Sequence, residues 1–252
     1  MLTILKFLVA PVLAGYVLIC LLLFLGQRSM IYFPQPRSHV HVPVLQLRNG
    51  EIKLLVAHRP KPSDRAVIYF GGNAEDVSAS LPELAASFPD AAIYALHYRG
   101  YGGSEGKPSE QALYADALAL HDRVQQQHRQ IVVIGRSLGS GVATYLGSQR
   151  PVERIVLVTP YSSIADIAAA QFPWIPERWL LKDPFDSARH VAKSRAPVRI
   201  IAAQHDDVIP AWSTQRLFSA APPALASQHV MAGVGHNDIS LNPLYWELLR
   251  KP

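Results

Sequence analysis

This 252-residue chain contains the stretch Ile131-Val132-Val133-Ile134-Gly135-Arg136-Ser137-Leu138-Gly139-Ser140-Gly141. Four aliphatic residues lead into a Gly-x-Ser-x-Gly pattern, and Val142–Leu146 continues with residues that are compatible with a helix. A short apolar run that ends in glycine is typical of a buried strand. The pattern therefore predicts a strand, a sharp turn and a helix, with the central residue of the turn held in a strained conformation.

Ser137, at the centre of this turn, is predicted to project from the carboxyl edge of a sheet. Gly135 and Gly139 are small where the strand and the helix approach each other closely. We therefore predict Ser137 as a nucleophile, and the amide of Leu138, at the N-terminus of the helix, as a donor to an oxyanion. The alternative is a glycine-rich turn whose serine only caps the helix.

A serine hydroxyl needs a positioned base, which a carboxylate in turn orients. Asp206 follows the predicted strand Val198–Ala203 and so lies on the same sheet edge as Ser137. His236 stands in a glycine-flanked loop after the last predicted strand. The chain order serine, acid, histidine is the order expected of an α/β-hydrolase arrangement. We predict a catalytic triad of Ser137, Asp206 and His236.

Neighbouring residues offer alternatives to these assignments. Asp207 is the rival acid, but adjacent loop residues point in different directions, so only one of the two carboxylates can meet His236. His205 is a weaker alternative base, because it precedes the acid instead of following the final strand. Asp238 is predicted to cap the ensuing turn or helix.

A second oxyanion donor is predicted on an early loop of the chain. Ala66–Phe70 is typical of a central buried strand, and it leads directly into Gly71-Gly72-Asn73-Ala74. A backbone N–H on such a loop supplies the second donor, and a developing oxyanion requires two preorganised donors. We assign this donor to Asn73, with Leu138 as its partner. A glycine-rich turn that only feeds a helix is the alternative.

Residues 44–252 are predicted to form one α/β domain. Asn49-Gly50 between two strand-like runs predicts a type I′ hairpin. Strands then alternate with helices, which predicts a mostly parallel central sheet with helices on both faces. Tyr161–Lys193, which is rich in proline and aromatic residues, is predicted to be a short cap. Its aromatics would line an acyl pocket or contact a bilayer, and plain packing on the sheet edge is the alternative.

Residues 1–27 are predicted to anchor the chain in a membrane. Phe7–Gly26 is about twenty residues without a charge, and a helix of that length spans about 30 Å, the thickness of the bilayer hydrocarbon. A cleaved signal peptide is the alternative, but the apolar run is long and no small-residue cleavage site follows it. Residues 28–43 are predicted to be a juxtamembrane linker that keeps the domain close to the membrane.

Composition narrows the range of partners. The formal net charge is +5 and the basic residues are dispersed, so no nucleic acid partner is expected. Cys20 is the only cysteine, which rules out an intrachain disulfide. His39 and His41 have a spacing that suits a metal, but no carboxylate or cysteine accompanies them. Neither a metal nor another cofactor is expected.

Five segments, at residues 72–74, 98–110, 135–141, 206–210 and 235–238, form an ordered set. Together they resemble membrane-associated α/β hydrolases of the depalmitoylase and serine-aminopeptidase-like branch. In that family the residue that matches Asp206, followed by x-Val-Ile, is the acid, so the resemblance favours Asp206 over Asp207. Two residues depart from the family pattern: Gly71 stands where relatives often carry His, and His97 where they usually carry Asp. Neither departure removes a member of the triad.

These features predict a membrane-anchored serine hydrolase that cleaves acyl esters or thioesters through an acyl-enzyme. Its partners would be an acylated substrate and the lipid bilayer. A serine peptidase or aminopeptidase on the same triad is one alternative, and it would need a carboxylate near the pocket to hold the free amine. A non-catalytic membrane interaction module on a hydrolase scaffold is the other, and the presence of all three triad residues argues against it.

Overall fold

The computed structural model describes residues 2–251, apart from the side chains of residues 2–8, 178 and 179. Its centre is an eight-stranded sheet in the order β1-β2-β4-β3-β5-β6-β7-β8. The strands are β1 (Val44–Asn49), β2 (Ile52–Arg59), β3 (Arg65–Phe70), β4 (Ala92–Leu96), β5 (Gln130–Arg136), β6 (Arg154–Val158), β7 (Val198–His205) and β8 (Ala226–Gly235). β2 is antiparallel to both its neighbours and every other pair is parallel, which confirms the predicted mostly parallel sheet.

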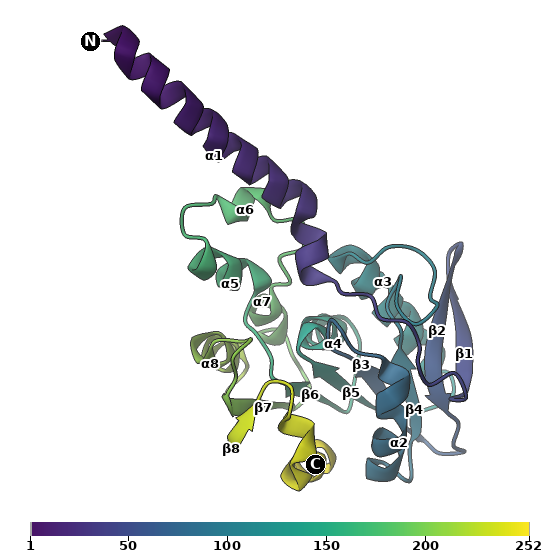
Figure 1. Ribbon diagram of the computed structural model, residues 1–252. Coiled ribbons are helices and arrows are strands. Elements are labelled where there is room, and N and C mark those ends of the chain that lie inside the picture. The colour runs from purple at the N-terminus through teal and green to yellow at the C-terminus, as the bar shows by residue number, and fades with distance from the viewer. Residues whose placement is uncertain (1, 252) are drawn as a thin grey trace.

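Helices cover both faces of this sheet, as predicted (Figure 1). They are α1 (Leu2–Ile31), α2 (Val77–Ser87), α3 (Glu110–Val124), α4 (Leu138–Gln149), α5 (Ile164–Gln171), α6 (Glu177–Leu180), α7 (Ser187–Val191), α8 (Ala211–Ala220), α9 (Pro243–Arg250) and the 3-10 helix η1 (Ile239–Leu241). Apolar side chains of α3, α4, α7 and α8 pack in one core, and those of α2 and α9 pack in the core on the opposite face.

The central strand β3 shows why its sequence is apolar throughout. Ile68 and Phe70 pack in the core beneath α3 and α4, whereas Val67 and Tyr69 pack in the core beneath α2 and α9. Successive side chains of a strand point to opposite faces, so a strand that is covered on both sides needs apolar residues at every position. This arrangement fixes β3 and β5 side by side, with the ends that lead into the candidate site at the same edge.

The local signals for turns and caps correspond to the structure in part. Asn49 pairs with Ile52, which confirms the β1–β2 hairpin and leaves Gly50 and Glu51 as its two loop residues. Gly50 has φ of 60° but Glu51 has no positive φ, so the predicted type I′ turn is wrong, and a glycine at the first loop position is typical of type II′. The side chain of Ser109 accepts the Ala112 amide and caps α3. β8, the last strand, pairs with β7 over most of its length.

Helix α1 extends beyond the predicted end of the anchor. It continues to Ile31, so the first four residues of the predicted linker 28–43 are helical. The apolar run marks the hydrophobic part of a helix, whereas Arg28 and Ser29 are polar and still compatible with helical backbone. Val9–Ile31 is long and apolar enough to cross a membrane, a test that a signal sequence also passes. In Figure 1, α1 projects from the domain past α5 and α6.

Candidate active site

Ser137 lies between β5 and α4, at the sharp turn predicted from the Gly-x-Ser-x-Gly pattern. Its φ is 48° and its ψ is −117°, a conformation that costs free energy for a residue with a Cβ atom. The Ser137 amide donates to the carbonyl oxygen of Val158 at 2.9 Å. The hydroxyl of Ser140 donates to the carbonyl oxygen of Ser137 at 2.6 Å. The turn is therefore held on both sides of its strained residue.

The two flanking glycines are required by the close approach of β5, β3 and α4. A Cβ atom on Gly139 would collide with the carbonyl oxygen of Phe70, and one on Gly135 would lie 2.7 Å from the Cβ atom of Ala143. Carbon atoms in favourable contact are about 3.5–4.0 Å apart. Neither position therefore accommodates a larger residue without a shift of backbone, which is the reason that the sequence analysis gave for these glycines.

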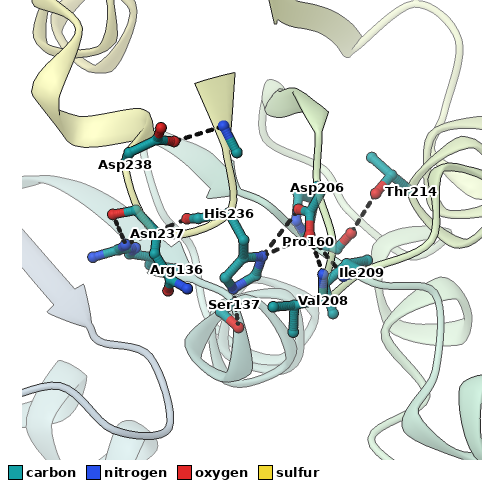
Figure 2. Close-up of polar contacts among 11 residues, drawn as sticks. Arg136, Ser137, Pro160, Asp206, Val208, Ile209, Thr214, His236, Asn237 and Asp238 are labelled. Carbon is teal, nitrogen blue, oxygen red and sulfur yellow. Dashed lines mark hydrogen bonds and ion pairs between the residues drawn. The ribbon is translucent and has the colours of Figure 1, made fainter. Parts of the chain in front are cut away.

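His236 lies between Ser137 and Asp206, as Figure 2 shows. Its Nε2 atom is 3.0 Å from Ser137 Oγ. Its Nδ1 atom is 2.9 Å from Oδ1 and 3.0 Å from Oδ2 of Asp206. The residue is only 5% exposed. With a proton on Nδ1, the ring donates to the carboxylate and presents Nε2 as an acceptor for the serine hydroxyl.

The carboxylate that meets this ring belongs to Asp206. Oδ1 of Asp206 also accepts the amides of Val208 at 3.0 Å and Ile209 at 2.7 Å, so the loop after β7 holds the carboxylate in place. The two neighbouring alternatives, Asp207 and His205, are exposed. The structure thus brings together Ser137, Asp206 and His236, three residues from distant parts of the chain.

The loop that carries His236 is tied down by two side chains. Asp238 Oδ1 accepts the amide of Gly235 at 2.6 Å. Asp238 stands at the N-terminus of η1 but makes no side-chain bond to it, so the predicted capping role is wrong and the side chain instead closes the histidine loop. Arg136 reaches the carbonyl oxygens of His236 and Asn237, each at 3.4 Å.

Of the two residues predicted to supply oxyanion donors, Leu138 follows Ser137 directly and Asn73 lies on the loop after β3. The amide of Leu138 lies at the start of α4. Within residues 2–251, neither this amide nor the amide of Asn73 donates a hydrogen bond. The loop of Asn73 is close to the nucleophile, since a Cβ atom on Gly72 would lie 3.8 Å from the Cβ atom of Ser137. The carbonyl oxygen of Gly72, in the same peptide as the Asn73 amide, accepts the Glu75 amide at 3.4 Å, and the carbonyl oxygen of Asn73 accepts the Tyr101 hydroxyl at 2.7 Å.

Glu75 is a residue near the site that the sequence analysis did not identify. Its carboxylate accepts the amide of Gly72 at 2.8 Å and the hydroxyls of Tyr69 at 2.7 Å and Ser80 at 2.6 Å. It also forms an ion pair with Arg136. Glu75 lies two residues beyond Asn73, and that position was the one available signal of its role in holding the loop.

The end of α1 also contacts the site, which the sequence analysis did not foresee. The side-chain amide of Asn73 donates to the carbonyl oxygen of Ile31 at 3.3 Å. The amide of Phe33 donates to the Tyr101 hydroxyl at 2.9 Å and lies 3.3 Å from the Asn73 carbonyl oxygen. The helix and the segment after it therefore pack directly on the loop of Asn73. In the described part of the chain, no group of three or more His, Cys, Asp or Glu residues could hold a metal ion.

Comparison with known proteins identifies the fold. Residues 66–196 match the model of the alpha/beta hydrolase fold family. The chain is 38% identical over 234 residues to the Mycobacterium tuberculosis protein Rv2307c, with 85% of this chain and 82% of that protein covered. It is 32% identical over 200 residues to the human alpha/beta hydrolase domain-containing protein 17C, with 77% of this chain and 59% of that protein covered.

Solved structures show the same fold at lower sequence identity. The Pyrococcus furiosus esterase Pf2001 superposes with a TM-score of 0.67 at 18% identity, over 82% of this chain and 90% of that chain. The thioesterase domain from the curacin biosynthetic pathway superposes with a TM-score of 0.61 at 16% identity, over 83% of this chain and 99% of that chain. The predicted α/β-hydrolase fold is confirmed.

Proposed function

The chain belongs to the α/β-hydrolase family, and we propose that it is a membrane-anchored serine hydrolase that cleaves acyl esters or thioesters. The observation that carries the proposal is the position of the His236 ring, 3.0 Å from Ser137 Oγ on one side and 2.9 Å from Asp206 on the other. An alcohol becomes a useful nucleophile near neutral pH when a positioned base accepts its proton and a third group orients that base.

In the proposed reaction, Ser137 Oγ attacks the carbonyl carbon of the substrate while His236 Nε2 takes its proton. Asp206 keeps the other proton on Nδ1 and stabilises the imidazolium. The bond to the leaving oxygen or sulfur then breaks, and His236 returns its proton to that group. Water, activated by the same ring, attacks the acyl-enzyme, releases the acid and regenerates the Ser137 hydroxyl.

The negative charge that develops on the substrate oxygen needs donors that are already in place. We assign this role to the amides of Leu138 and Asn73. The Leu138 amide lies at the N-terminus of α4, where the helix dipole also favours negative charge. The peptide that carries the Asn73 amide is held through the Gly72 carbonyl oxygen, which accepts the Glu75 amide, and the next carbonyl oxygen accepts the Tyr101 hydroxyl, so this loop needs little reorganisation during the reaction.

The proposed anchor is α1, retained in the mature protein. Gln27 Nε2 donates to the carbonyl oxygen of Leu180 at 3.0 Å, and its Oε1 accepts the Lys182 amide at 2.6 Å. Arg28 binds the carboxylate of Asp183, a side chain that is 2% exposed. Removal of α1 as a signal peptide would remove Gln27 and Arg28, and the buried carboxylate of Asp183 would lose both hydrogen bonds from Arg28. The contacts therefore favour an uncleaved helix over a signal sequence.

A fluorophosphonate probe tests the proposal, because such probes react with activated serines. We expect the full-length chain in detergent to be labelled at Ser137, and the Ser137→Ala protein to stay unlabelled while retaining its fold. Ser148→Ala, a change of the same type later in α4, is the matched control and should be labelled like the wild type. Labelling that survives Ser137→Ala would refute the assignment.

The bond that is cleaved is tested with parallel substrates. We expect turnover of p-nitrophenyl acyl esters and of acyl thioesters, and none of amino-acid anilides. Turnover of anilides in preference to esters would support the peptidase alternative. A folded protein that turns over none of these substrates would support the non-catalytic interaction module. Each outcome therefore separates one class of function from the others.

A further inference from the structure

A cavity of about 190 Å³ lies between the C-terminal half of α1 and the cap helices α5 and α6. Figure 1 shows α1 passing beside these two short helices as it leaves the domain. Most of its lining is apolar: Leu23, Phe24 and Ile31 on α1 face Ile167, Ala168 and Phe172 on the cap. One wall of this groove is thus the same helix that is apolar enough to cross a membrane.

Specific contacts fix α1 against the cap, so the groove is a built feature. Gln27 makes hydrogen bonds to Leu180, the last residue of α6, and to Lys182. Arg28 binds the buried Asp183 through Nε at 2.8 Å and through a second nitrogen at 3.3 Å. The ammonium group of Lys182 lies 3.9 Å over the ring of Phe24. A helix that only tethered the domain would need none of these contacts.

The end of the groove at Ile31 lies beside the loop of Asn73. Ile31, on the α1 wall, accepts a hydrogen bond from the side chain of Asn73 through its carbonyl oxygen. On the cap wall, Ile164 follows Tyr161 by three residues, and the Tyr161 hydroxyl lies 3.3 Å from the carbonyl oxygen of Leu138. The α1 wall therefore ends beside Asn73, and the segment that leads into the cap wall contacts Leu138.

Beyond the groove, the tip of the cap contacts α1 within the candidate membrane span. The hydroxyl of Tyr16 donates to the carbonyl oxygen of Trp174 at 2.9 Å, and Trp174, in the loop between α5 and α6, is 51% exposed. Tyr16 precedes Ile31 by fifteen residues, which is about 22 Å along a helix. The tip of the cap is therefore at the depth of the hydrocarbon whenever α1 spans a bilayer.

We propose that this groove receives the linear acyl chain of a substrate that enters sideways from the bilayer, with its carbonyl carbon at Ser137. The inference rests on the proposed hydrolase function and adds to it a substrate class, long-chain acyl esters or thioesters held in a membrane. An apolar groove at hydrocarbon depth fits an alkyl chain, and its end at Ile31 lies beside the loop of Asn73, which is proposed to bind the carbonyl oxygen. Each buried methylene is expected to contribute about fourfold to kcat/KM.

The test uses the full-length chain in phospholipid vesicles, with p-nitrophenyl palmitate and p-nitrophenyl acetate as substrates. Ala168→Phe and Leu23→Trp obstruct the groove from opposite walls. Ala170→Phe and Leu22→Trp are matched controls, because Ala170 and Leu22 are exposed and lie outside the lining. We expect both obstructing variants to lower kcat/KM for palmitate at least tenfold while acetate changes less than twofold. Both controls should leave the two substrates within twofold of the wild type.

The remaining outcomes separate the two proposals. If kcat/KM for palmitate and for acetate falls equally in both obstructing variants, or falls for neither substrate, the groove is not the acyl site. A control variant that loses as much palmitate turnover as its obstructing counterpart would overturn the groove as the acyl site as well. Wild-type protein that hydrolyses neither ester would instead contradict the proposed hydrolase function.

Discussion

The guanidinium of Arg136 lies 3.8 Å from the carboxylate of Glu75. This ion pair joins two loops that approach Ser137 from different parts of the chain. Glu75 holds the amide of Gly72 beside Asn73, whereas Arg136 reaches the carbonyl oxygen of His236. Arg136 is also the residue immediately before Ser137. One ion pair therefore connects the segments that carry the nucleophile, the base and a proposed oxyanion donor.

Glu75→Gln is expected to lower kcat by between about 10- and 100-fold, with a smaller change in KM. The substitution removes the charge that pairs with Arg136, and a displacement of about 1 Å at a reacting group costs about 100-fold in rate. Steady-state kinetics on a short acyl ester measure the effect. The matched control is Glu83→Gln, since Glu83 is exposed on α2, and it should behave like the wild type. Equal kinetics for the two variants would show that Glu75 does not position the site.

Asp206→Asn is expected to lower kcat by about 10³- to 10⁴-fold, because an amide in place of the carboxylate favours the wrong tautomer of His236. The control is Asp207→Asn, a substitution of the same type on the next residue, whose side chain is exposed. It should change kcat less than twofold. Fluorophosphonate labelling rates provide a second measurement. The assignment of the acid fails if the larger loss is found for Asp207→Asn.

The features that the sequence predicted best are those that local chemistry determines. The turn at Ser137 follows from the apolar run and the two glycines, and β3 follows from five consecutive apolar residues. The meeting of Asp206 and His236 was predictable because each follows a strand of a parallel sheet, and such strands end at one edge. Nothing beyond strand order and residue type was needed to bring these groups together.

The features that the sequence did not predict depend on contacts between distant segments. Glu75 and Arg136 are 61 positions apart, and Gln27 and Leu180 are 153 apart. No periodicity or motif in the chain links such pairs, because their proximity depends on how the finished domain packs. The end of α1 was misplaced for a related reason. In the sequence, Arg28 is a charge that follows an apolar run, which is typical of a residue beyond the end of a helix. In the structure it is a helical residue that binds the cap.

A pH dependence of stability is expected from His97, which lies away from the candidate site. Burial lowers the pKa of His97 to about 4, and its Nε2 atom is 2.8 Å from the hydroxyl of Ser78. In the unfolded chain its pKa is about 6.5. Between pH 4 and pH 6.5 the unfolded chain binds more protons at this histidine than the folded chain does. The contribution of neutral His97 to the free energy of unfolding is therefore fully present above pH 6.5 and is lost as the pH falls to about 4. The difference corresponds to about 3 kcal/mol.

His97→Gln should remove this part of the pH dependence, because glutamine does not titrate and still offers hydrogen-bonding groups to Ser78. The measurement is the free energy of unfolding in urea at pH 7 and at pH 4.5, followed by tryptophan fluorescence. His41→Gln is the control, since His41 is exposed and should retain the wild-type dependence. If His97→Gln loses as much stability between pH 7 and pH 4.5 as the wild type does, other groups cause the loss.

Arg28→Ala should loosen α1 from the domain. Asp183 is buried and would retain only the Glu110 amide as a donor, at 3.2 Å. The loss of hydrogen bonds to a charged group is expected to lower the free energy of unfolding by about 2 kcal/mol, which lowers Tm by about 4–8 °C in a domain of this size. Thermal unfolding of the full-length chain in detergent gives the shift.

The partner of Arg28 is tested by a double-mutant cycle with Asp183→Asn. If the two side chains stabilise the helix through each other, the double variant loses less stability than the sum of the single variants. Arg48→Ala, at an exposed arginine of β1, should shift the free energy of unfolding by no more than about 0.5 kcal/mol. Strict additivity of Arg28→Ala and Asp183→Asn would mean that the ion pair does not hold α1. The groove between α1 and the cap would then lack the fixed wall that its proposed role requires.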